Sequence, residues 1–163
     1  MIKYMNLIGI KARKASEYKV TTEVKNKVLN DYAKLIKNEK KFIINQNSKD
    51  INYARKKGLK ENLIKRLHLN ENKLDRIINS ILKIAKLKDP IDNTLEKWKR
   101  PNGLNIKRVS IPIGVIGVIY ESRPNVTADV SSLCFKSGNS VILKGGSEAY
   151  FTNKILADLF RKS

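Results

Sequence analysis

Apolar residues recur every three or four positions through the early part of the chain, which predicts a series of amphipathic helices. The first begins at Thr22, whose hydroxyl can cap the helix, and it carries Glu23 in its first turn. We expect this helix to bury one apolar face against other helices. That face consists of Val24, Val28, Tyr32, Leu35 and Ile36.

Three further helices are predicted downstream. A short helix is opened by Ser48 and Asp50 and ends at Gly58, where a residue without a Cβ can adopt positive φ. A brief helix follows around residues 63–67. The last begins at Asn70 and is stopped by Pro90. Its apolar stripe consists of Leu74, Ile77, Ile78, Ile81, Ile84 and Ala85.

From Leu95 onward the pattern changes to alternation between apolar and polar residues, which is typical of strands. The dipeptide Asn102-Gly103 separates two such segments and is a strong signal for a β-hairpin turn. We expect Trp98 to lie across from the returning strand, where it has a packing role. The alternation is clearest at Leu104, Ile106 and Val109.

Two continuous apolar runs, Val115–Tyr120 and Val141–Leu143, are typical of strands buried on both faces. A helix is predicted from Val126 to Lys136, and a last helix, capped by Ser147, follows the second run. This order predicts a βαβα unit with a parallel sheet. Two strands buried on both faces need further neighbouring strands, so we expect them to belong to a larger sheet. The apolar faces are Val126, Val130, Leu133 and Cys134 in one helix, and Tyr150, Ile155, Leu156, Leu159 and Phe160 in the other.

Polar clusters follow both predicted strands, at Glu121–Asn125 and at Lys144–Glu148, where a parallel sheet binds its ligands. The Asn125 amide can donate to a developing oxyanion, although the pattern alone favours a cap for the helix that follows. Gly145 and Gly146 precede a helix N-terminus, whose free N–H groups favour an anion. The chain has no glycine-rich dinucleotide fingerprint and no P-loop.

The single cysteine, Cys134, falls inside a predicted helix on its apolar side. A nucleophilic thiolate needs a cation, a base or a helix N-terminus beside it, together with partial exposure. The pattern supplies none of these, so we expect Cys134 to be structural. One cysteine and one histidine (His68, to which we assign no role) leave little basis for a metal site, and none is predicted.

The net charge is +19, from 34 basic and 15 acidic residues. Most of the bases are lysine, and asparagine and isoleucine are also abundant, which is the profile expected from A/T-rich codon usage. A designed phosphate-binding surface favours arginine. Specific nucleic-acid binding is therefore not predicted. No apolar run approaches the length of a membrane span, and no signal-peptide layout is present, so an intracellular protein is expected.

Two stretches, GVIGVIYESRPNVT and CFKSGNSVILKGGSEA, closely resemble glutamate-5-semialdehyde dehydrogenase (gamma-glutamyl phosphate reductase), a branch of the aldehyde dehydrogenase superfamily. Upstream segments such as NSKDINYARKKGL and LIKRLHLNENKLDRI fit the same family, and the resemblance covers essentially the whole chain. It implies an α/β fold in which N-terminal helices precede the first βαβα portion of an aldehyde-dehydrogenase-type, Rossmann-like cofactor domain. Family members are much longer, so the chain is expected to be a truncated N-terminal part.

The resemblance also implies a division of the chain. Residues 1–94 would be the N-terminal helical region of the cofactor domain, and residues 95–112 a β-hairpin extension of the oligomerisation type. Residues 113–163 would be an incomplete dinucleotide-binding βαβα unit. The family is expected to form homo-oligomers in the cytoplasm, without membrane attachment.

The family's reaction is the NADPH-dependent reduction of L-glutamyl 5-phosphate to glutamate 5-semialdehyde and phosphate, in proline biosynthesis. By motif, Asn125 would stabilise the oxyanion. The nucleophilic cysteine of the family lies downstream of the region represented here. Arg123 would be a substrate-anion contact. The stretch that would lie near the adenosine ribose and its 2′-phosphate consists of Lys144, Gly145, Gly146, Ser147 and Glu148.

Three functional hypotheses follow. The chain is an N-terminal piece that is inactive alone, or a half-enzyme completed by a second polypeptide. The third, a basic nucleic-acid-binding protein on the same scaffold, is disfavoured because the basic region lacks an arginine-rich stripe and an aromatic platform.

Overall fold

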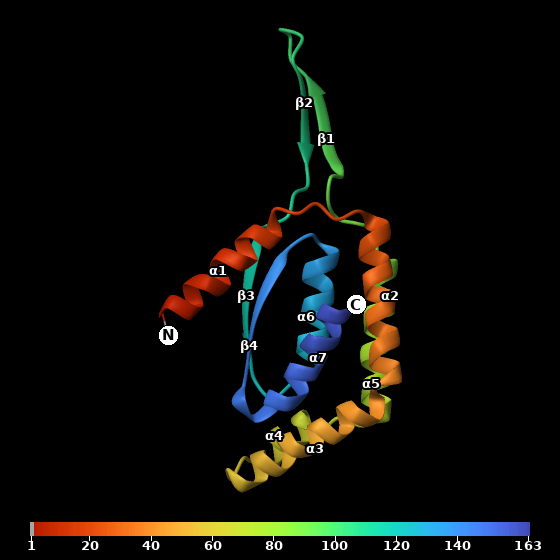
Figure 1. Cartoon of the computed structure of the whole chain (residues 1–163). Coiled ribbons are helices and arrows are strands. Elements are labelled where there is room, and N and C mark those ends of the chain that lie inside the picture. The colour runs from red at the N-terminus through yellow and green to blue at the C-terminus, as the bar shows by residue number, and fades with distance from the viewer. Residues whose placement is uncertain (1) are drawn as a thin grey trace.

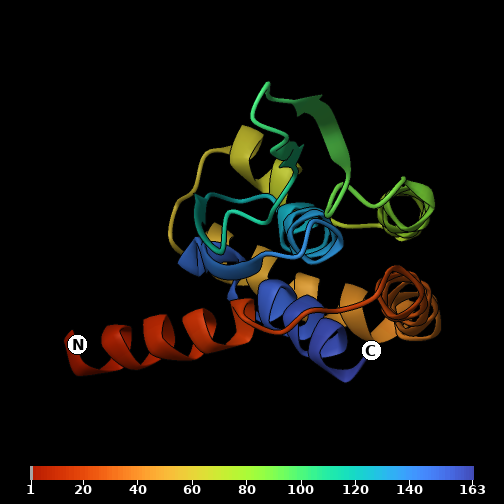
Figure 2. The same ribbon diagram turned by 90° about the horizontal axis from the view of Figure 1, so that it is seen from above.

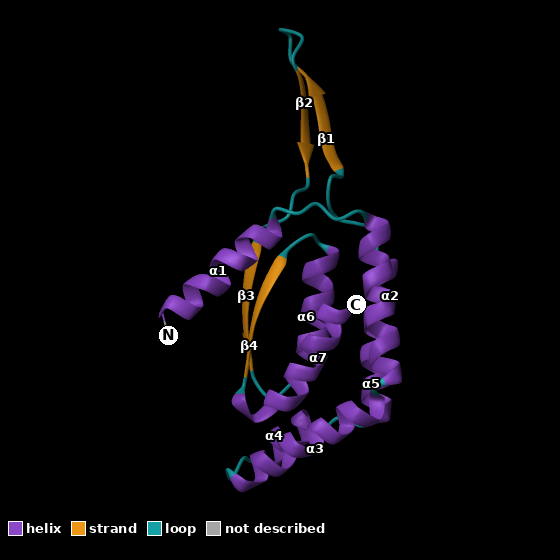
Figure 3. Cartoon of the chain, in the orientation of Figure 1, coloured by secondary structure: helices purple, strands orange, loops and turns teal. Residues whose placement is uncertain are grey.

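The computed structural model describes residues 2–163. Helices lie on either side of a small parallel sheet, and a separate β-hairpin projects from the molecule (Figure 1). Figure 3 shows the same arrangement by type of secondary structure. The elements are α1 (Ile2–Ser16), α2 (Thr22–Asn38), α3 (Lys40–Lys56), α4 (Glu61–Leu67), α5 (Glu71–Lys86), β1 (Thr94–Lys99), β2 (Asn105–Val109), β3 (Val115–Tyr120), α6 (Asn125–Lys136), β4 (Ser140–Gly145), the 3-10 turn η1 (Ser147–Ala149) and α7 (Tyr150–Lys162).

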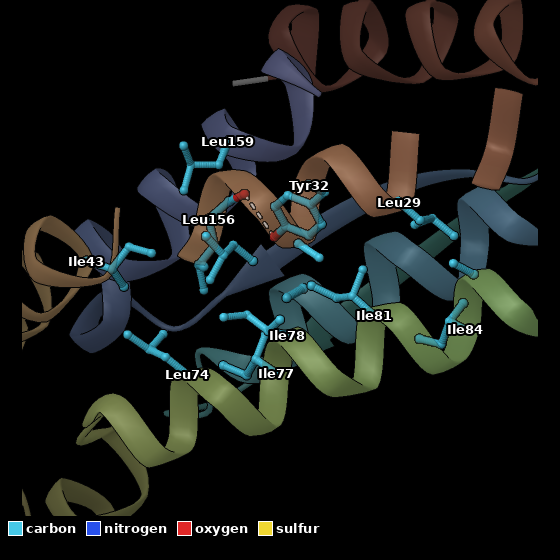
Figure 4. Close-up of a cluster of buried hydrophobic side chains, with 14 of the residues drawn as sticks. Leu29, Tyr32, Ile43, Leu74, Ile77, Ile78, Ile81, Ile84, Leu156 and Leu159 are labelled. Atoms are coloured by element: carbon cyan, nitrogen blue, oxygen red, sulfur yellow. Dashed lines mark hydrogen bonds between the residues drawn. The ribbon is translucent and has the colours of Figure 1, made fainter. Parts of the chain in front are cut away.

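The main core lies among α2, α5, α6 and α7, with Ile43 of α3 also contributing (Figure 4). Its centre is Tyr32, whose side chain is fully buried and whose hydroxyl donates to the Leu156 carbonyl oxygen at 3.1 Å. The Phe160 ring meets the Tyr32 ring edge-on, with the ring centroids 5.0 Å apart. Each fully buried leucine or isoleucine contributes about 1.5–3 kcal/mol. The predicted apolar stripe of α5 is confirmed, since all six of its residues are buried.

The predicted βαβα unit is confirmed: β3 and β4 pair in parallel, from Val115 opposite Ser140 to Tyr120 opposite Gly145. The prediction that both faces of the strands are buried is wrong at Ile119, whose side chain is 87% exposed. Helices α6 and α1 contact β4 on opposite sides (Figure 2). Within residues 2–163, no third strand pairs with this sheet.

The predicted hairpin is also confirmed. Strands β1 and β2 are antiparallel, Trp98 faces Ile106, and the hairpin extends away from the helices (Figure 1). Its base is fixed by Asp89, whose carboxylate accepts from the Lys25 ammonium and the Thr22 hydroxyl, both at 2.9 Å. Lys25 is buried, so the ion pair is screened little by water.

Several predicted helix boundaries are wrong. The cap of α2 is Thr21, whose hydroxyl accepts from the Val24 N–H, because the side chain of Thr22 turns to Asp89 instead. Helix α3 already begins at Lys40, so Ser48 lies in its middle rather than at its start. The prediction for α5 is closer, since Asn70 caps it, but the helix ends at Lys86, ahead of the proline.

The predicted apolar face of α6 is only partly right. Cys134 is buried, but Leu133 is 49% exposed, and the residues that pack inward include Ser131 and Ser132. The hydroxyls of these serines donate to the carbonyl oxygens of Thr127 and Ala128, four residues earlier, so their burial leaves no unpaired group. Small satisfied hydroxyls therefore take core positions that a hydropathy pattern assigns to apolar side chains.

Helix α1 was not predicted from the sequence. It packs against β4 and β3, yet none of its residues is buried, and apolar side chains occur on several sides of it. The last helix differs too: Ser147 begins a 3-10 turn and makes no cap, and Tyr150 is exposed.

Candidate functional site

The polar segments after the two parallel strands begin side by side. Because Tyr120 pairs with Gly145, the chain leaves β3 and β4 at the same level of the sheet (Figure 3). The segments Glu121–Asn125 and Gly146–Glu148 therefore start at one edge, as the sequence predicts. This is the edge at which open α/β sheets bind ligands.

One carboxylate joins the two segments. Oε1 of Glu148 accepts hydrogen bonds from the Ser122 backbone N–H at 2.9 Å and from the Ser122 hydroxyl at 2.8 Å. Burial alone would raise the pKa of Glu148, but hydrogen bonds from its own backbone and from Ser122, together with the nearby Lys144 charge, lower it below its ordinary value. Glu148 is therefore held as a carboxylate that fixes the spacing of the two loops.

Asn125 is the first residue of α6 and not its cap, so the capping interpretation is wrong; the cap position is Pro124, without a side-chain bond. Its Nδ2 donates to Oδ2 of Asp129 at 3.1 Å, one turn along the helix. The other oxygen of Asp129 accepts from the Ser80 hydroxyl at 3.0 Å, which anchors this pair to α5. The amide has two hydrogens, and the bond to Asp129 occupies one of them. Within residues 2–163 the second hydrogen has no recorded hydrogen-bond partner.

The two glycines at the end of β4, Gly145 and Gly146, lie in close packing. A Cβ on Gly145 would collide with the Asn153 amide and press on the Tyr120 ring, and a Cβ on Gly146 would collide with the Glu148 carboxylate. Behind Gly145, the Tyr120 hydroxyl lies 2.6 Å from the Thr127 hydroxyl. These glycines let the loop lie directly against the sheet and α7. Lys144 and Ser147 are exposed beside them.

The N-terminus of α7 is already occupied by a side chain. Asp50, buried on α3, accepts from the backbone N–H groups of Phe151 at 3.0 Å and Thr152 at 2.8 Å, and from the Thr152 hydroxyl at 2.6 Å. Burial raises the pKa of Asp50 against the opposing effect of these bonds. Two of the N–H donors of the predicted anion site are therefore already used by Asp50. An anion could bind only to the N–H groups of the loop that precedes α7.

A cavity of about 310 Å³ opens at the end of β3. Arg123 is the only predicted site residue that lines it; Asn125, Lys144 and Ser147 do not. The other wall of the cavity comes from α4 and was not predicted, because a short helix has too few residues for its pattern to show which face it presents. The cavity is lined by Leu63, Arg66, Ile119, Tyr120, Glu121, Ser122, Arg123 and Val126.

Cys134 lies away from these groups. It is nine residues beyond Asn125 on α6, or about 13 Å along the helix axis. Its side chain is 7% exposed, and burial raises the pKa of its thiol. Within residues 2–163, no cluster of histidine, cysteine and acidic side chains has the geometry to hold a metal ion. Nor does any helix in that range combine the length and apolarity of a membrane span.

Solved structures of other proteins share this arrangement of helices before a parallel βαβα unit. A putative aldehyde dehydrogenase from Bacillus subtilis has this fold, with a TM-score of 0.64 and 20% identity over 91% of this chain and 31% of that one. No protein-family model matches the chain.

Two closer relatives narrow the class. The chain is 47% identical to the gamma-glutamyl phosphate reductase of Halothermothrix orenii over 155 residues, 92% of this chain and 37% of that protein. The crystal structure of gamma-glutamyl phosphate reductase from Thermotoga maritima superposes with a TM-score of 0.90 and 41% identity, covering 93% of this chain and 37% of that one. The resemblance expected from the sequence is confirmed: the chain is homologous to the gamma-glutamyl phosphate reductases, and it spans little more than a third of their length.

Proposed function

We propose that this chain supplies the cofactor loop and the oxyanion site of an enzyme that reduces L-glutamyl 5-phosphate to glutamate 5-semialdehyde with NADPH, releasing phosphate. The setting is proline biosynthesis in the cytoplasm. The observation that carries the proposal is the similarity to gamma-glutamyl phosphate reductases over 92% of the chain, at 47% identity. The reaction is a property of the whole enzyme, of which this chain matches 37%.

The strand-end geometry supports specific roles. Asn125, oriented by Asp129, donates its remaining amide hydrogen to the oxyanion formed at the acyl carbon. Lys144 and Ser147 lie exposed on the loop after β4 and contact the adenosine ribose and its 2′-phosphate, which selects NADPH over NADH. Glu148 uses Oε1 for Ser122 and keeps Oε2 as an acceptor for a ribose hydroxyl.

The remaining assignments follow the same division of the chain. Residues 1–94 build the helical part of the cofactor domain, 113–163 contribute part of its sheet, and the hairpin region 95–112 joins subunits of a homo-oligomer. Trp98 and Leu95 are 40% and 59% exposed on the hairpin, and apolar side chains of this size gain free energy when a second subunit covers them.

The chain by itself has no activated nucleophile. Cys134 is its only cysteine, and its burial disfavours the thiolate that phosphate displacement requires. We therefore expect the 163-residue chain to be inactive alone. Activity requires the part of the enzyme that carries the nucleophile, from a continuous chain or from a second polypeptide.

The experiment measures the reverse reaction, the reduction of NADP in the presence of glutamate 5-semialdehyde and phosphate. The purified chain is assayed alone and after mixing with a polypeptide covering the unmatched part of the Halothermothrix orenii relative. We expect activity only in the mixture, with Cys134→Ala as active as the parent chain. Activity of the chain alone that disappears in Cys134→Ala would refute the assignment of Cys134. A fluorescence titration with NADPH tests the cofactor loop independently.

A further inference from the structure

The cavity at the end of β3 contains two arginines without ion-pair partners. Arg66 projects from α4, and Arg123 belongs to the loop after β3; neither takes part in an ion pair within residues 2–163. Glu121 lines the same cavity and is likewise free of ion pairs there. The cavity thus presents two positive groups and one negative group.

The rest of the lining combines apolar side chains with the hydroxyl-bearing residues Tyr120 and Ser122. Leu63, Ile119 and Val126 contribute to it, and Ile119 is 87% exposed. An isoleucine in water at the rim of a charged cavity gains free energy when a ligand covers it. The volume of about 310 Å³ stands at the lower end of the range for small-molecule sites, about 300–1,000 Å³, so the cavity suits a small metabolite and is too small for a dinucleotide.

From this combination we propose that the cavity binds the α-amino acid head of the substrate, with Arg66 receiving its α-carboxylate. The inference deepens the proposed function and rests on it. A guanidinium fork matches a carboxylate through two parallel hydrogen bonds. Glu121 is the group in the same cavity that attracts an α-ammonium, and the apolar residues contact the methylene chain between the two ends.

The position of Arg123 supports this polarity. Arg123 lies two residues before Asn125 and Val126 one residue after it, so the wall that they form belongs to the same segment as the proposed oxyanion donor. The phosphate-bearing end of the substrate therefore belongs beside Arg123. Arg66 comes from a separate element, α4, and is available for the opposite end of the molecule. Arg66 thus acts in recognition of the amino acid and not in the chemical step.

The test is a titration of the isotope-labelled 163-residue chain with L-glutamate, followed through the methyl resonances of Ile119 and Val126. We expect saturable shifts, with a dissociation constant in the millimolar range, about 1–10 mM. Arg66→Ala weakens binding about tenfold or more, because it removes a charged two-bond contact, and Arg66→Lys restores only part of the affinity. Glutarate, which lacks the ammonium group, binds more weakly than L-glutamate.

Lys65→Ala is the matched control, since Lys65 is an exposed cation on the same helix that does not line the cavity. Its affinity for L-glutamate should equal that of the parent chain. Equal affinities for L-glutamate, glutarate and inorganic phosphate would show an unselective anion site and overturn the inference. So would the absence of any shift, or shifts that persist unchanged in Arg66→Ala. NADPH binding by the same samples reports on the proposed function separately, and Arg66→Ala should leave it unchanged.

Discussion

Replacing Asp50 with alanine removes the acceptor of three hydrogen bonds at the start of α7. Losing a helix cap costs about 0.5–2 kcal/mol. The Thr152 hydroxyl, which is fully buried, loses its carboxylate acceptor at a further cost of about 1–3 kcal/mol. Part of this is offset because a carboxylate whose pKa is raised by burial no longer has to be desolvated. We therefore expect Asp50→Ala to lower the free energy of unfolding by about 2–4 kcal/mol.

Urea unfolding followed by circular dichroism measures this loss. Ser48→Ala is the matched control, because Ser48 is exposed on the same helix and its hydroxyl bonds only to the Ile44 carbonyl one turn earlier. We expect it to change the free energy of unfolding by less than about 0.5 kcal/mol. A loss below about 1 kcal/mol in Asp50→Ala, or a loss equal to that of the control, would refute the role of Asp50 as the cap of α7.

Four other predictions follow from the site and the sheet. In the complemented enzyme, Asn125→Ala should lower the rate about 10²–10³-fold with unchanged NADPH affinity, and an unchanged rate would remove Asn125 from the mechanism. Cys134→Ala should lower the free energy of unfolding in urea by about 1 kcal/mol and leave the turnover rate unchanged. Because the folded pKa of Glu148 lies below its ordinary 4.5, the stabilising bond to Ser122 is present above that pH and lost as pH falls through the folded pKa. The stability difference between the parent and Glu148→Gln should therefore shrink in acid, and a constant difference in urea from pH 7 down to about pH 3 would contradict this. Ile119→Lys should reduce aggregation of the isolated chain in light scattering, since the uncovered strand end is apolar; equal aggregation would place the liability elsewhere.

The sequence predicted the sheet well because its signals are local. A five- or six-residue apolar run and an Asn-Gly turn specify a strand and a hairpin without reference to the rest of the chain. The strand bounds Val115–Tyr120 agree with β3 to the residue. The roles of buried polar side chains were not predictable in this way. Asp50 looked like a helix start, and only the fold brings α3 against the N-terminus of α7.

In the candidate site, too, the residues marked by local motifs were predicted and the contacts that depend on the fold were not. Motif resemblance located Asn125 and the stretch after β4, and strand order placed them at one edge. Neither source could show that Glu148 joins the two loops, because its partner Ser122 is 26 residues away in the sequence and follows a different strand, β3. Arg66 was missed for a similar reason, since only the fold brings α4 and the end of β3 to the same cavity.

The contact between α3 and α7 affects when the chain can complete its folding during synthesis. Asp50 and Thr152 are 102 residues apart in the sequence, and Asn47 is 105 residues from the same threonine. At a synthesis rate of about 5–20 residues per second, α3 leaves the ribosome several seconds before its polar partners exist. During that interval the Asp50 carboxylate, which is buried in the folded chain, lacks the three hydrogen bonds that it accepts from α7. Helices α2 and α5 can pack against each other as soon as both are made, but α3 is expected to gain its buried polar contacts only when α7 emerges.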